Sequence, residues 1–388
     1  MEKSDRETAV RGLRILVLTD TPILGVGGSE RFLRNLLGRL PQEYQIDVLQ
    51  LCRKPDSGSV VGTLDETRVR IAYRPVRAIY GMAGLAAITH VRRMVRAGKY
   101  DIVQSHHEKS DLINALLPRD SAYPRRLSNR RDMGFQKSRR MRWLMRKLNR
   151  RFDRIVAPSP AILDALVSTE RVMPDKVVCI PNGVDTRKFA PVGESDKVAT
   201  RKEFGVAADD LLVGCVANLF PVKRHRDLID ALARVRAVMP RTHLVLIGDG
   251  PLRPELEAQI RSLGLQDTVH LLGDRDDIPR LLPALDLFVL ASSSEGLSNA
   301  ILEAQACALP VVATRVGGNP DLVEEDCGKL VRVEDPHMLA DAMLELLQDP
   351  LLRSRLGSTA RARVEQKHSL QAMVDSYLCL YRDLVREH

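Results

Sequence analysis

The sequence predicts two α/β domains, each built around a parallel sheet with helices on both faces. The chain has 388 residues, too many for one ordinary α/β domain and suited to two of about 180 to 200 residues each. Short runs rich in Val, Ile and Leu alternate with helical patterns, which is typical of right-handed βαβ units. The apolar fraction of 44% with only 4% aromatic residues favours buried parallel strands over an all-β fold.

The first half of the chain shows this alternation clearly. The expected strands are 14–19, 46–51, 69–73, 101–105, 126–129, 154–158 and 177–180. The expected helices are an amphipathic helix that carries Phe32 to Leu40 and stops at Pro41, helices 84–97 and 111–117, a basic helix within 135–152, and helix 160–169.

Periodicity is lost after Pro181-Asn182-Gly183 and returns near Arg201, so this stretch is expected to be an interdomain hinge. A second series follows, with expected strands 211–216, 242–247, 269–272, 287–290 and 311–314. The last helix, about 369–385, has one apolar side and is expected to cross back onto the first domain. The predicted domains are therefore 1–183 with 369–388, and 184–368.

Several classes of protein are disfavoured by composition. No apolar run is long enough to span a bilayer, and the first residues are charged, so we expect a cytoplasmic protein. The six cysteines are scattered without a Cys-x-x-Cys pair, which favours free thiols in a reducing compartment. The net charge of +9 is concentrated between Arg125 and Arg154, where 13 basic residues face only Asp132 and Asp153.

A glycine-rich loop, Gly25 to Ser29, lies between the first strand and the first helix. Glycines admit a ligand close to the backbone, and the helix N-terminus behind them attracts anions. The loop can therefore bind a phosphate, or it can be a structural tight turn. Its spacing is not Gly-x-Gly-x-x-Gly, and no acidic residue ends the second strand, which argues against a dinucleotide-dependent dehydrogenase.

A more specific pattern follows the strand 287–290, where a doubly wound sheet binds its ligands. Glu295 lies in the loop before a helix that begins near Ser298, and Glu303 lies inside that helix. Between them lie the amides of Gly296, Leu297 and Ser298, which are expected to donate hydrogen bonds to a ligand. Amides donate to phosphate and carboxylates accept from sugar hydroxyls, so the segment is suited to a sugar diphosphate.

These residues resemble the retaining glycosyltransferases of family 4, which have the GT-B fold of two Rossmann-like domains facing a central cleft. The Glu-x7-Glu element at Glu295 and Glu303 is the best match. Further elements in the same order are Gly27-Gly28-Ser29-Glu30, Asn182-Gly183-Val184-Asp185, Val216-Ala217-Asn218-Leu219 leading to Lys223, Gly248-Asp249-Gly250-Pro251-Leu252, and Gly317-Gly318-Asn319-Pro320. The resemblance covers nearly the whole chain.

The resemblance implies a role for each matching residue. Glu303 would hold the donor ribose, and Glu295 with the amides of Gly296, Leu297 and Ser298 would contact the donor sugar. Lys223 would neutralise the diphosphate, which Gly27 and Gly28 would admit from the other domain. Asn218 stands where relatives often have a basic residue, so Arg224 or Arg226 would supply a second charge. The same pattern assigns Gly248, and Asp277 in the nucleobase loop, to the nucleotide.

In the first domain the resemblance points to Arg130, which follows the strand 126–129, as a contact of the donor sugar or its phosphate. His106 follows the strand 101–105 and is a second catalytic candidate, because residues after these strands are expected to face the cleft. His106 and His107 are adjacent, so at most one is expected to face the cleft, and a merely polar loop role is the alternative. The cluster Asp274-Arg275-Asp276-Asp277 could be mistaken for a metal site. Because it contains its own arginine, a solvated turn or helix cap is the preferred interpretation.

The resemblance implies sugar transfer from a nucleoside diphosphate sugar, with a UDP-sugar favoured over a GDP-sugar, to a glycan or lipid-linked acceptor. It implies retention of configuration and neither a metal nor a resident cofactor. Two rivals are a nucleotide-sugar epimerase of the same fold, which generally lacks the Glu-x7-Glu element, and a non-catalytic basic module that binds membrane or nucleic acid.

The basic segment 135–152 carries an apolar stripe of Met141, Leu144, Met145, Leu148 and Phe152. Such a helix can lie on an anionic membrane surface, or it can pack its stripe into the core and expose its charges. Both readings remain open from the sequence. A nucleic-acid partner is not expected, because stacking aromatic residues are nearly absent.

Overall fold

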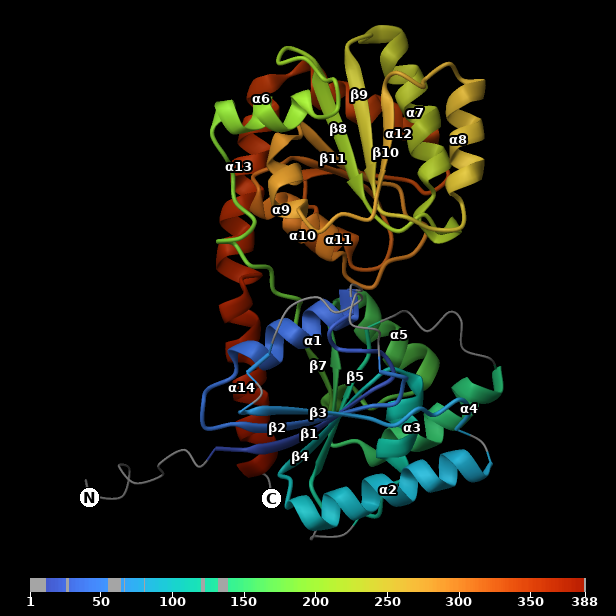
Figure 1. The fold of residues 1–388 in the computed structure, drawn as a ribbon, viewed down its shortest axis with the longest axis vertical. Helices are drawn as coiled ribbons and strands as arrows, with labels where there is room; N and C mark the ends of the chain where they lie inside the picture. The colour runs from blue at the N-terminus through green and yellow to red at the C-terminus, as the bar shows by residue number, and fades with distance from the viewer. Residues whose placement is uncertain are drawn as a thin grey trace, which may run out of the picture. The chain divides into compact units, whose positions relative to one another are not determined.

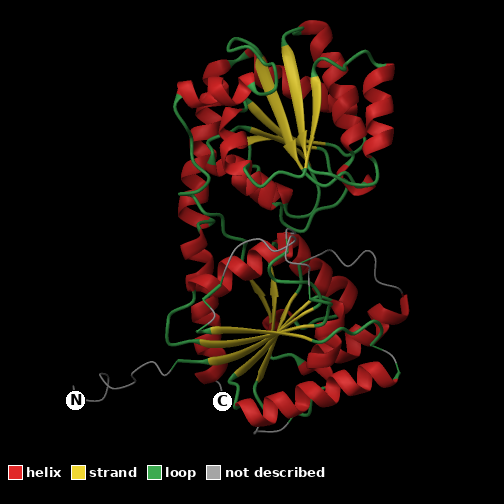
Figure 2. Ribbon diagram, viewed as in Figure 1, coloured by secondary structure: helices red, strands yellow, loops and turns green. Residues whose placement is uncertain are grey.

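The structure is a computed structural model that describes residues 12–25, 28–54, 64–65, 67–79, 81–119, 123–131 and 139–386. It contains two compact units, one formed by Met1–Pro181 with Met373–His388 and the other by Asn182–Ala372. In each unit the strands form one parallel sheet with helices on both faces (Figures 1 and 2). The prediction of two doubly wound α/β domains is confirmed.

The N-terminal unit has a seven-stranded sheet of order β3-β2-β1-β4-β5-β6-β7. Its strands are β1 (Arg14–Thr19), β2 (Gln45–Gln50), β3 (Val69–Tyr73), β4 (Ile102–His106), β5 (Arg125–Asn129), β6 (Arg154–Ala157) and β7 (Val177–Cys179). Its helices are α1 (Gly28–Arg39), α2 (Met82–Gly98), α3 (Glu108–Leu116), α4 (Arg139–Leu148) and α5 (Pro160–Glu170), together with most of the last helix, α14 (Leu370–Arg386).

Alternation along the strands of this unit decides which helix covers which face of the sheet. Leu16, Leu18 and Val103 point to one face and share a core cluster with Val91 of α2 and Ile113 of α3. The residues between them in sequence point to the opposite face, because successive side chains of a strand alternate. That opposite face is covered by α1 and α14.

Helix α14 docks on the N-terminal unit through buried tyrosines. The Tyr377 hydroxyl donates to Asn129 Oδ1 at 2.5 Å, and the Tyr381 hydroxyl donates to Gln104 Oε1 at 2.6 Å. Both tyrosines are fully buried. The prediction that the last helix packs back onto the first domain is confirmed.

The C-terminal unit has a six-stranded sheet of order β10-β9-β8-β11-β12-β13. Its strands are β8 (Leu211–Val216), β9 (Thr242–Ile247), β10 (Val269–Gly273), β11 (Leu287–Leu290), β12 (Val311–Thr314) and β13 (Gly328–Val331). Its helices are α6 (Glu194–Lys202), α7 (His225–Val238), α8 (Arg253–Ser262), α9 (Ile278–Leu281), α10 (Asn299–Ala306), α11 (Asn319–Leu322), α12 (Pro336–Gln348) and α13 (Pro350–Lys367).

Two elements of this unit were not expected from the sequence. Helix α6 occupies the stretch interpreted as hinge; it is polar, and among its residues Thr200 and Arg201 are buried, so it lacks an apolar period. Strand β13 has four residues and no clear alternation of buried and exposed positions. Both elements are stabilised by tertiary contacts rather than by a local pattern.

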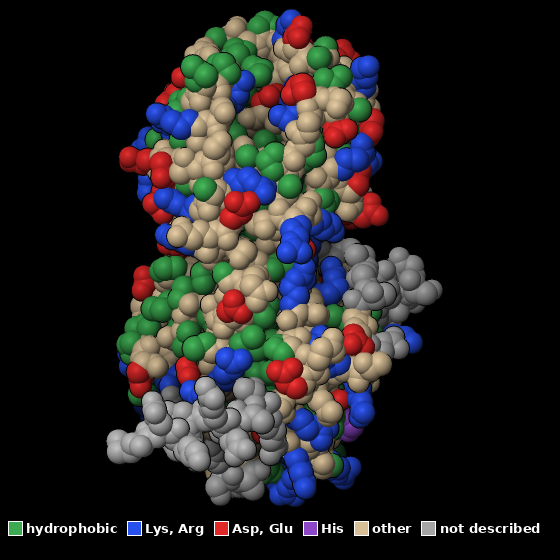
Figure 3. Space-filling view, turned by 90° about the vertical axis from the view of Figure 1, so that its left-hand side faces the viewer, with side chains coloured by type: hydrophobic (Ala, Val, Ile, Leu, Met, Phe, Trp, Pro, Cys, Tyr) green, Lys and Arg blue, Asp and Glu red, His purple; other side chains and the backbone are tan. Residues whose placement is uncertain are grey.

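On the face shown in Figure 3, basic and acidic side chains of the C-terminal unit are interspersed. Ion pairs of this unit include Arg241 with Asp210 and Lys329 with Glu345. Within the described ranges, every helix is too short or too polar to cross a lipid bilayer.

Candidate active site

The loop from β11 to α10 holds the Glu-x7-Glu element at the carboxyl end of the C-terminal sheet. Ser298 caps α10, since its side chain accepts a hydrogen bond from the Ile301 amide at 3.3 Å. The cap fixes the point at which the chain turns from loop to helix. Leu297 is buried beneath this turn. The amides at the N-terminus of α10 are thereby held at the sheet edge, where they can donate to an anion.

Lys223 and Glu295 form an ion pair at this edge. Lys223 ends a short 3-10 turn, Pro221–Lys223, and its Nζ lies 2.6 Å from Glu295 Oε1. The Ser292 hydroxyl donates to the same oxygen at 2.6 Å. The lysine side chain is 25% exposed and the glutamate 9%. The pair therefore offers a fixed ammonium and a fixed carboxylate side by side, although the two residues are far apart in the sequence.

A second loop, after β12, packs against the loop that carries Glu295 and forms hydrogen bonds with it. Gly317 has φ +49°, and a Cβ there would lie 1.7 Å from the Glu295 carbonyl oxygen. The Gly318 amide donates to the Gly296 carbonyl at 3.0 Å, and the Thr314 hydroxyl donates to the Ser292 carbonyl at 2.5 Å. Only glycine fits at position 317 without displacing Glu295, which explains why this element has its glycine there.

Glu303 lies inside α10 and is 4% exposed. Burial raises the pKa of the Cys215 thiol, which interacts with Lys223 and Glu295, to about 12, so this cysteine stays protonated and is no nucleophile. Ser292 was missed as a site residue by the sequence prediction. Its position in the same loop, three residues before Glu295, was the available signal.

The predicted residues Asn218 and Gly248 follow the ends of the neighbouring strands β8 and β9. Gly248 has φ +135°, and a Cβ there would lie 2.3 Å from the Ala217 carbonyl oxygen. The two strand ends are thus in close backbone contact. Only glycine therefore fits at position 248.

Charged residues around this edge are already paired with one another. Arg224 contacts Asp227 at 2.6 Å and Glu334 at 2.7 Å, while Arg226 forms an exposed pair with Glu255. Hydrogen bonds from Arg275 and Arg280 hold the pKa of Asp277 well below its usual range. Asp277 is therefore an ionised carboxylate in a cluster with its own arginines, in keeping with a solvated turn rather than a metal ligand.

The N-terminal unit places Arg130 in a buried network. Its Nε lies 2.8 Å from Asp111 Oδ2, and its terminal nitrogens contact Glu170 and Asn149 at 3.1 and 3.0 Å. The Arg130 side chain is 5% exposed. Because its guanidinium nitrogens are paired with Asp111, Glu170 and Asn149, the structure argues against direct contact of Arg130 with the donor sugar or its phosphate.

His106 is also fully buried, at the end of β4, where its ring lies 6.1 Å from that of Phe32. Gly28 is the first residue of α1 and is exposed. Gly27 lies outside the described residues. The roles predicted for Arg130, His106, Gly27 and Gly28 stay predictions.

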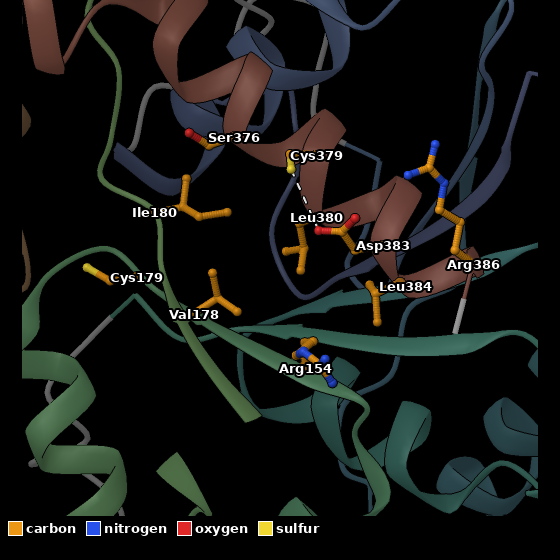
Figure 4. Close-up of a pocket in the computed structure, with 10 residues that line it drawn as sticks. All are labelled: Arg154, Val178, Cys179, Ile180, Ser376, Cys379, Leu380, Asp383, Leu384 and Arg386. Carbon is orange, nitrogen blue, oxygen red and sulfur yellow. Dashed lines mark hydrogen bonds between the residues drawn. The ribbon is translucent and has the colours of Figure 1, made fainter. Parts of the chain in front are cut away.

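A groove of about 590 Å³ lies elsewhere on the N-terminal unit (Figure 4). Val178 and Ile180 form one side of it, Leu380 and Leu384 of α14 the other, and Cys379 donates to Asp383 at 3.6 Å. None of the residues that line it was predicted as a site residue.

Comparison with known proteins assigns the family. Residues 26–188 match the model described as Glycosyltransferase Family 4, and residues 210–349 match that described as Glycosyl transferases group 1. This chain belongs to glycosyltransferase family 4. Membership supports a glycosyltransferase and favours sugar transfer over the epimerase and the non-catalytic module.

The relatives are named for different donors and acceptors. A UDP-Gal:alpha-D-GlcNAc-diphosphoundecaprenol alpha-1,3-galactosyltransferase of Escherichia coli is 28% identical over 89% of this chain and 91% of its own length. N-acetyl-alpha-D-glucosaminyl L-malate synthase of Bacillus anthracis is 30% identical over 61% of each chain. A GDP-mannose-dependent monoacylated alpha-(1-6)-phosphatidylinositol monomannoside mannosyltransferase of Corynebacterium glutamicum is 34% identical over 50% of this chain and 53% of its own length.

Solved structures share the fold. HepE of Anabaena, in complex with UDP, has a TM-score of 0.82 at 24% identity and covers 96% of this chain and 100% of its own. Sucrose-phosphate synthase of Thermosynechococcus elongatus has a TM-score of 0.81 at 21% identity and covers 97% and 100%. The fold is that of the GT-B glycosyltransferases, as the resemblance implied.

Proposed function

We propose that this family 4 enzyme transfers a sugar from a nucleoside diphosphate sugar, with a UDP-sugar favoured, and retains the anomeric configuration. The observation that carries the proposal is the 2.6 Å pair of Lys223 and Glu295 beside the capped N-terminus of α10. The ammonium and the helix amides stabilise the charge that grows on the departing diphosphate. In this proposal they supply the positive charge without a metal, and Glu303 holds the ribose.

The preference for uridine is supported by fold neighbours. HepE has been solved with UDP and with UDP-glucose, and a mutant of TarM of S. aureus, which shares the fold, has been solved with UDP among its ligands. The Escherichia coli relative is named for UDP-Gal, whereas the Corynebacterium relative is named for GDP-mannose. A GDP-sugar is therefore the alternative that the experiment must separate.

We further propose that the acceptor carries a negatively charged group, as a lipid-linked glycan diphosphate does. The relatives are named for a GlcNAc-diphosphoundecaprenol, an L-malate, a phosphatidylinositol mannoside and an inositol 3-phosphate. These acceptors differ in their carbon skeletons. A phosphate or carboxylate is the feature that they share.

Thermal stabilisation of the full chain by nucleotides tests the donor assignment. Without divalent metal, UDP at 100 times its Kd is expected to stabilise the folded state by about 2.7 kcal/mol, and GDP and ADP less. Glu303→Ala should abolish the shift, because the ribose loses its acceptor. Arg241→Ala, which changes an exposed arginine far from this loop, serves as the control. A shift that needs added metal, or that survives Glu303→Ala, would contradict the proposal.

We also propose that the exposed face of α4 contacts an anionic membrane surface. The apolar stripe is not available for this, because Met141, Met145 and Leu148 are buried in the core. The opposite face exposes Arg140, Trp143 and Lys147, and Lys147 Nζ lies 3.9 Å above the Trp143 ring. Spacings of three and four place these side chains on one helical face. Residues 135–138 of the predicted basic helix lie outside the described residues.

Co-sedimentation with lipid vesicles tests the membrane proposal. Binding to vesicles that contain an anionic phospholipid is expected to fall with salt and to be lost with Lys147→Glu together with Trp143→Ala, since cations and an interfacial aromatic residue drive it. Vesicles of neutral lipid are the control. Equal binding to both vesicle types would refute an electrostatic surface.

A further inference from the structure

Four neighbouring strands of the N-terminal sheet place the last residue of each in one row. Gln50 of β2 is paired with Thr19 of β1, Thr19 with His106 of β4, and His106 with Asn129 of β5. Strand order reverses between β1 and β4, so the row crosses the topological switch point of this sheet. In open α/β sheets, ligands bind beyond the strand ends at such a point. We call Gln50, His106 and Asn129 the switch-point row.

Hydrogen bonds fix the orientation of both amide side chains in the row. The Ile23 amide donates to Gln50 Oε1 at 2.6 Å, and the Tyr377 hydroxyl donates to Asn129 Oδ1 at 2.5 Å. Each amide oxygen therefore already accepts a hydrogen bond, and each NH2 group points away from that donor. Gln50 Nε2 and Asn129 Nδ2 are buried and have no hydrogen-bond partner among the described residues.

Hydrogen-bond partners also determine which ring nitrogen of His106 carries the proton. Tyr381 donates to Gln104 Oε1, so the Gln104 amide presents its N–H groups to His106 Nε2, 2.8 Å away. His106 Nε2 must accept, and burial lowers the pKa of this histidine well below its usual value, so the ring is neutral. A neutral ring with an accepting Nε2 carries its proton on Nδ1. His106 Nδ1 is also buried without a partner within the described part of the chain.

The switch-point row thus presents three buried N–H donors, and the described residues offer them no acceptor. A buried donor without an acceptor is destabilising, and such groups in native proteins require an explanation such as a bound ion or ligand. Their partner must be rich in oxygen acceptors. Neighbouring strands are about 4.8 Å apart, so the row is roughly 14 Å long, more than one phosphate spans and suited to a diphosphate or a phosphorylated sugar.

A positive charge lies beside the row. Arg131 follows Asn129 by two residues, and its guanidinium carbon lies 3.7 Å from the centre of the Phe32 ring. Phe32 in turn packs against His106 and Tyr377, with ring centres 6.1 and 5.8 Å apart. His107, next to His106, has φ 74° and ψ 174°, a conformation that glycine normally adopts. Strained backbone of this kind gathers at functional sites.

We propose that the switch-point row and Arg131 form the subsite for the anionic group of the acceptor. This inference rests on the proposed function, whose acceptor carries such a group. The row donates N–H groups to the phosphate or carboxylate oxygens, and Arg131 neutralises their charge. In this arrangement Arg131, rather than the buried Arg130, is the basic residue after β5 that binds the anionic group of the acceptor.

Binding of inorganic pyrophosphate by the full chain tests the subsite, measured by calorimetry with the donor site saturated by UDP. Asn129→Asp and Gln50→Glu keep the oxygen that is already bonded and replace the donor by a carboxylate oxygen. Each should weaken pyrophosphate at least tenfold and leave the UDP affinity unchanged. Gln259→Glu, which introduces the same charge in the C-terminal unit, should keep wild-type affinity. Arg131→Gln gives the same test at a half-buried side chain, in case the variants at fully buried residues fail to fold.

Histidine nitrogen NMR gives a second readout independent of activity. The His106 signals should report a proton on Nδ1, and pyrophosphate should shift that signal. A proton on Nε2, or pyrophosphate binding that all three variants leave intact, would overturn the proposal. So would an absence of pyrophosphate binding, which would mean that water alone satisfies the row. Failure of UDP to bind would instead count against the donor assignment, since pyrophosphate can be titrated without it.

Discussion

Replacing Lys223 by alanine is expected to lower kcat for sugar transfer by about 100- to 1,000-fold, the usual loss when one preorganised charge partner of a developing anion is removed. The Lys223 ammonium is held 2.6 Å from Glu295, so it is preorganised at the place proposed for the leaving diphosphate. Its loss also leaves the nearly buried Glu295 carboxylate without its cation, close to a donor of the same charge. Steady-state turnover of the UDP-sugar measures the effect.

Arg226→Ala is the matched control for Lys223→Ala. Arg226 lies three residues further along, is 59% exposed and pairs with the equally exposed Glu255, so its removal should change kcat less than twofold. The double variant Lys223→Met with Glu295→Gln should lose less than the two single losses combined, because the residues act as a pair. A Lys223→Ala enzyme within tenfold of wild type would refute leaving-group stabilisation by this lysine.

Replacing Arg130 by alanine is expected to lower the free energy of unfolding by about 3–5 kcal/mol, the cost of breaking a buried ion pair. Arg130 bridges Asp111 and Glu170, whose side chains are 2% and 6% exposed, and Asp111 also accepts from Ser105 and Ser128 at 2.7 Å each. Removing the guanidinium leaves two buried carboxylates uncompensated. Urea unfolding monitored by circular dichroism measures the loss.

The control for Arg130 is Arg241→Ala, since Arg241 is 64% exposed and pairs with Asp210 at the surface. Its cost should stay within about 1 kcal/mol. If Arg130→Ala instead kept wild-type stability but lost turnover, the donor-contact role implied by the resemblance would be supported. The structural role assigned to the network would then be wrong.

The sequence alone determined the local elements and the chemistry of the C-terminal loop. Strand and helix positions follow from apolar periodicity, which the chain carries wherever an element buries one side, and β1, β8, β9, β11 and β12 lie at the predicted residues. Glu295, Glu303 and the amides between them could be predicted as a unit because they are adjacent in sequence. Elements held by tertiary contacts, such as the polar helix α6, left no such pattern.

The tertiary structure decided which polar residues are engaged and which are left with unmatched groups. The resemblance pointed to Arg130, but the fold buries Arg130 between Asp111 and Glu170. Gln50, His106 and Asn129 become one row only through strand register, and their unmatched donors arise from tyrosines more than two hundred residues away and from the Ile23 amide. Periodicity is a local property, whereas hydrogen-bond partners and burial depend on segments that meet only when the chain folds.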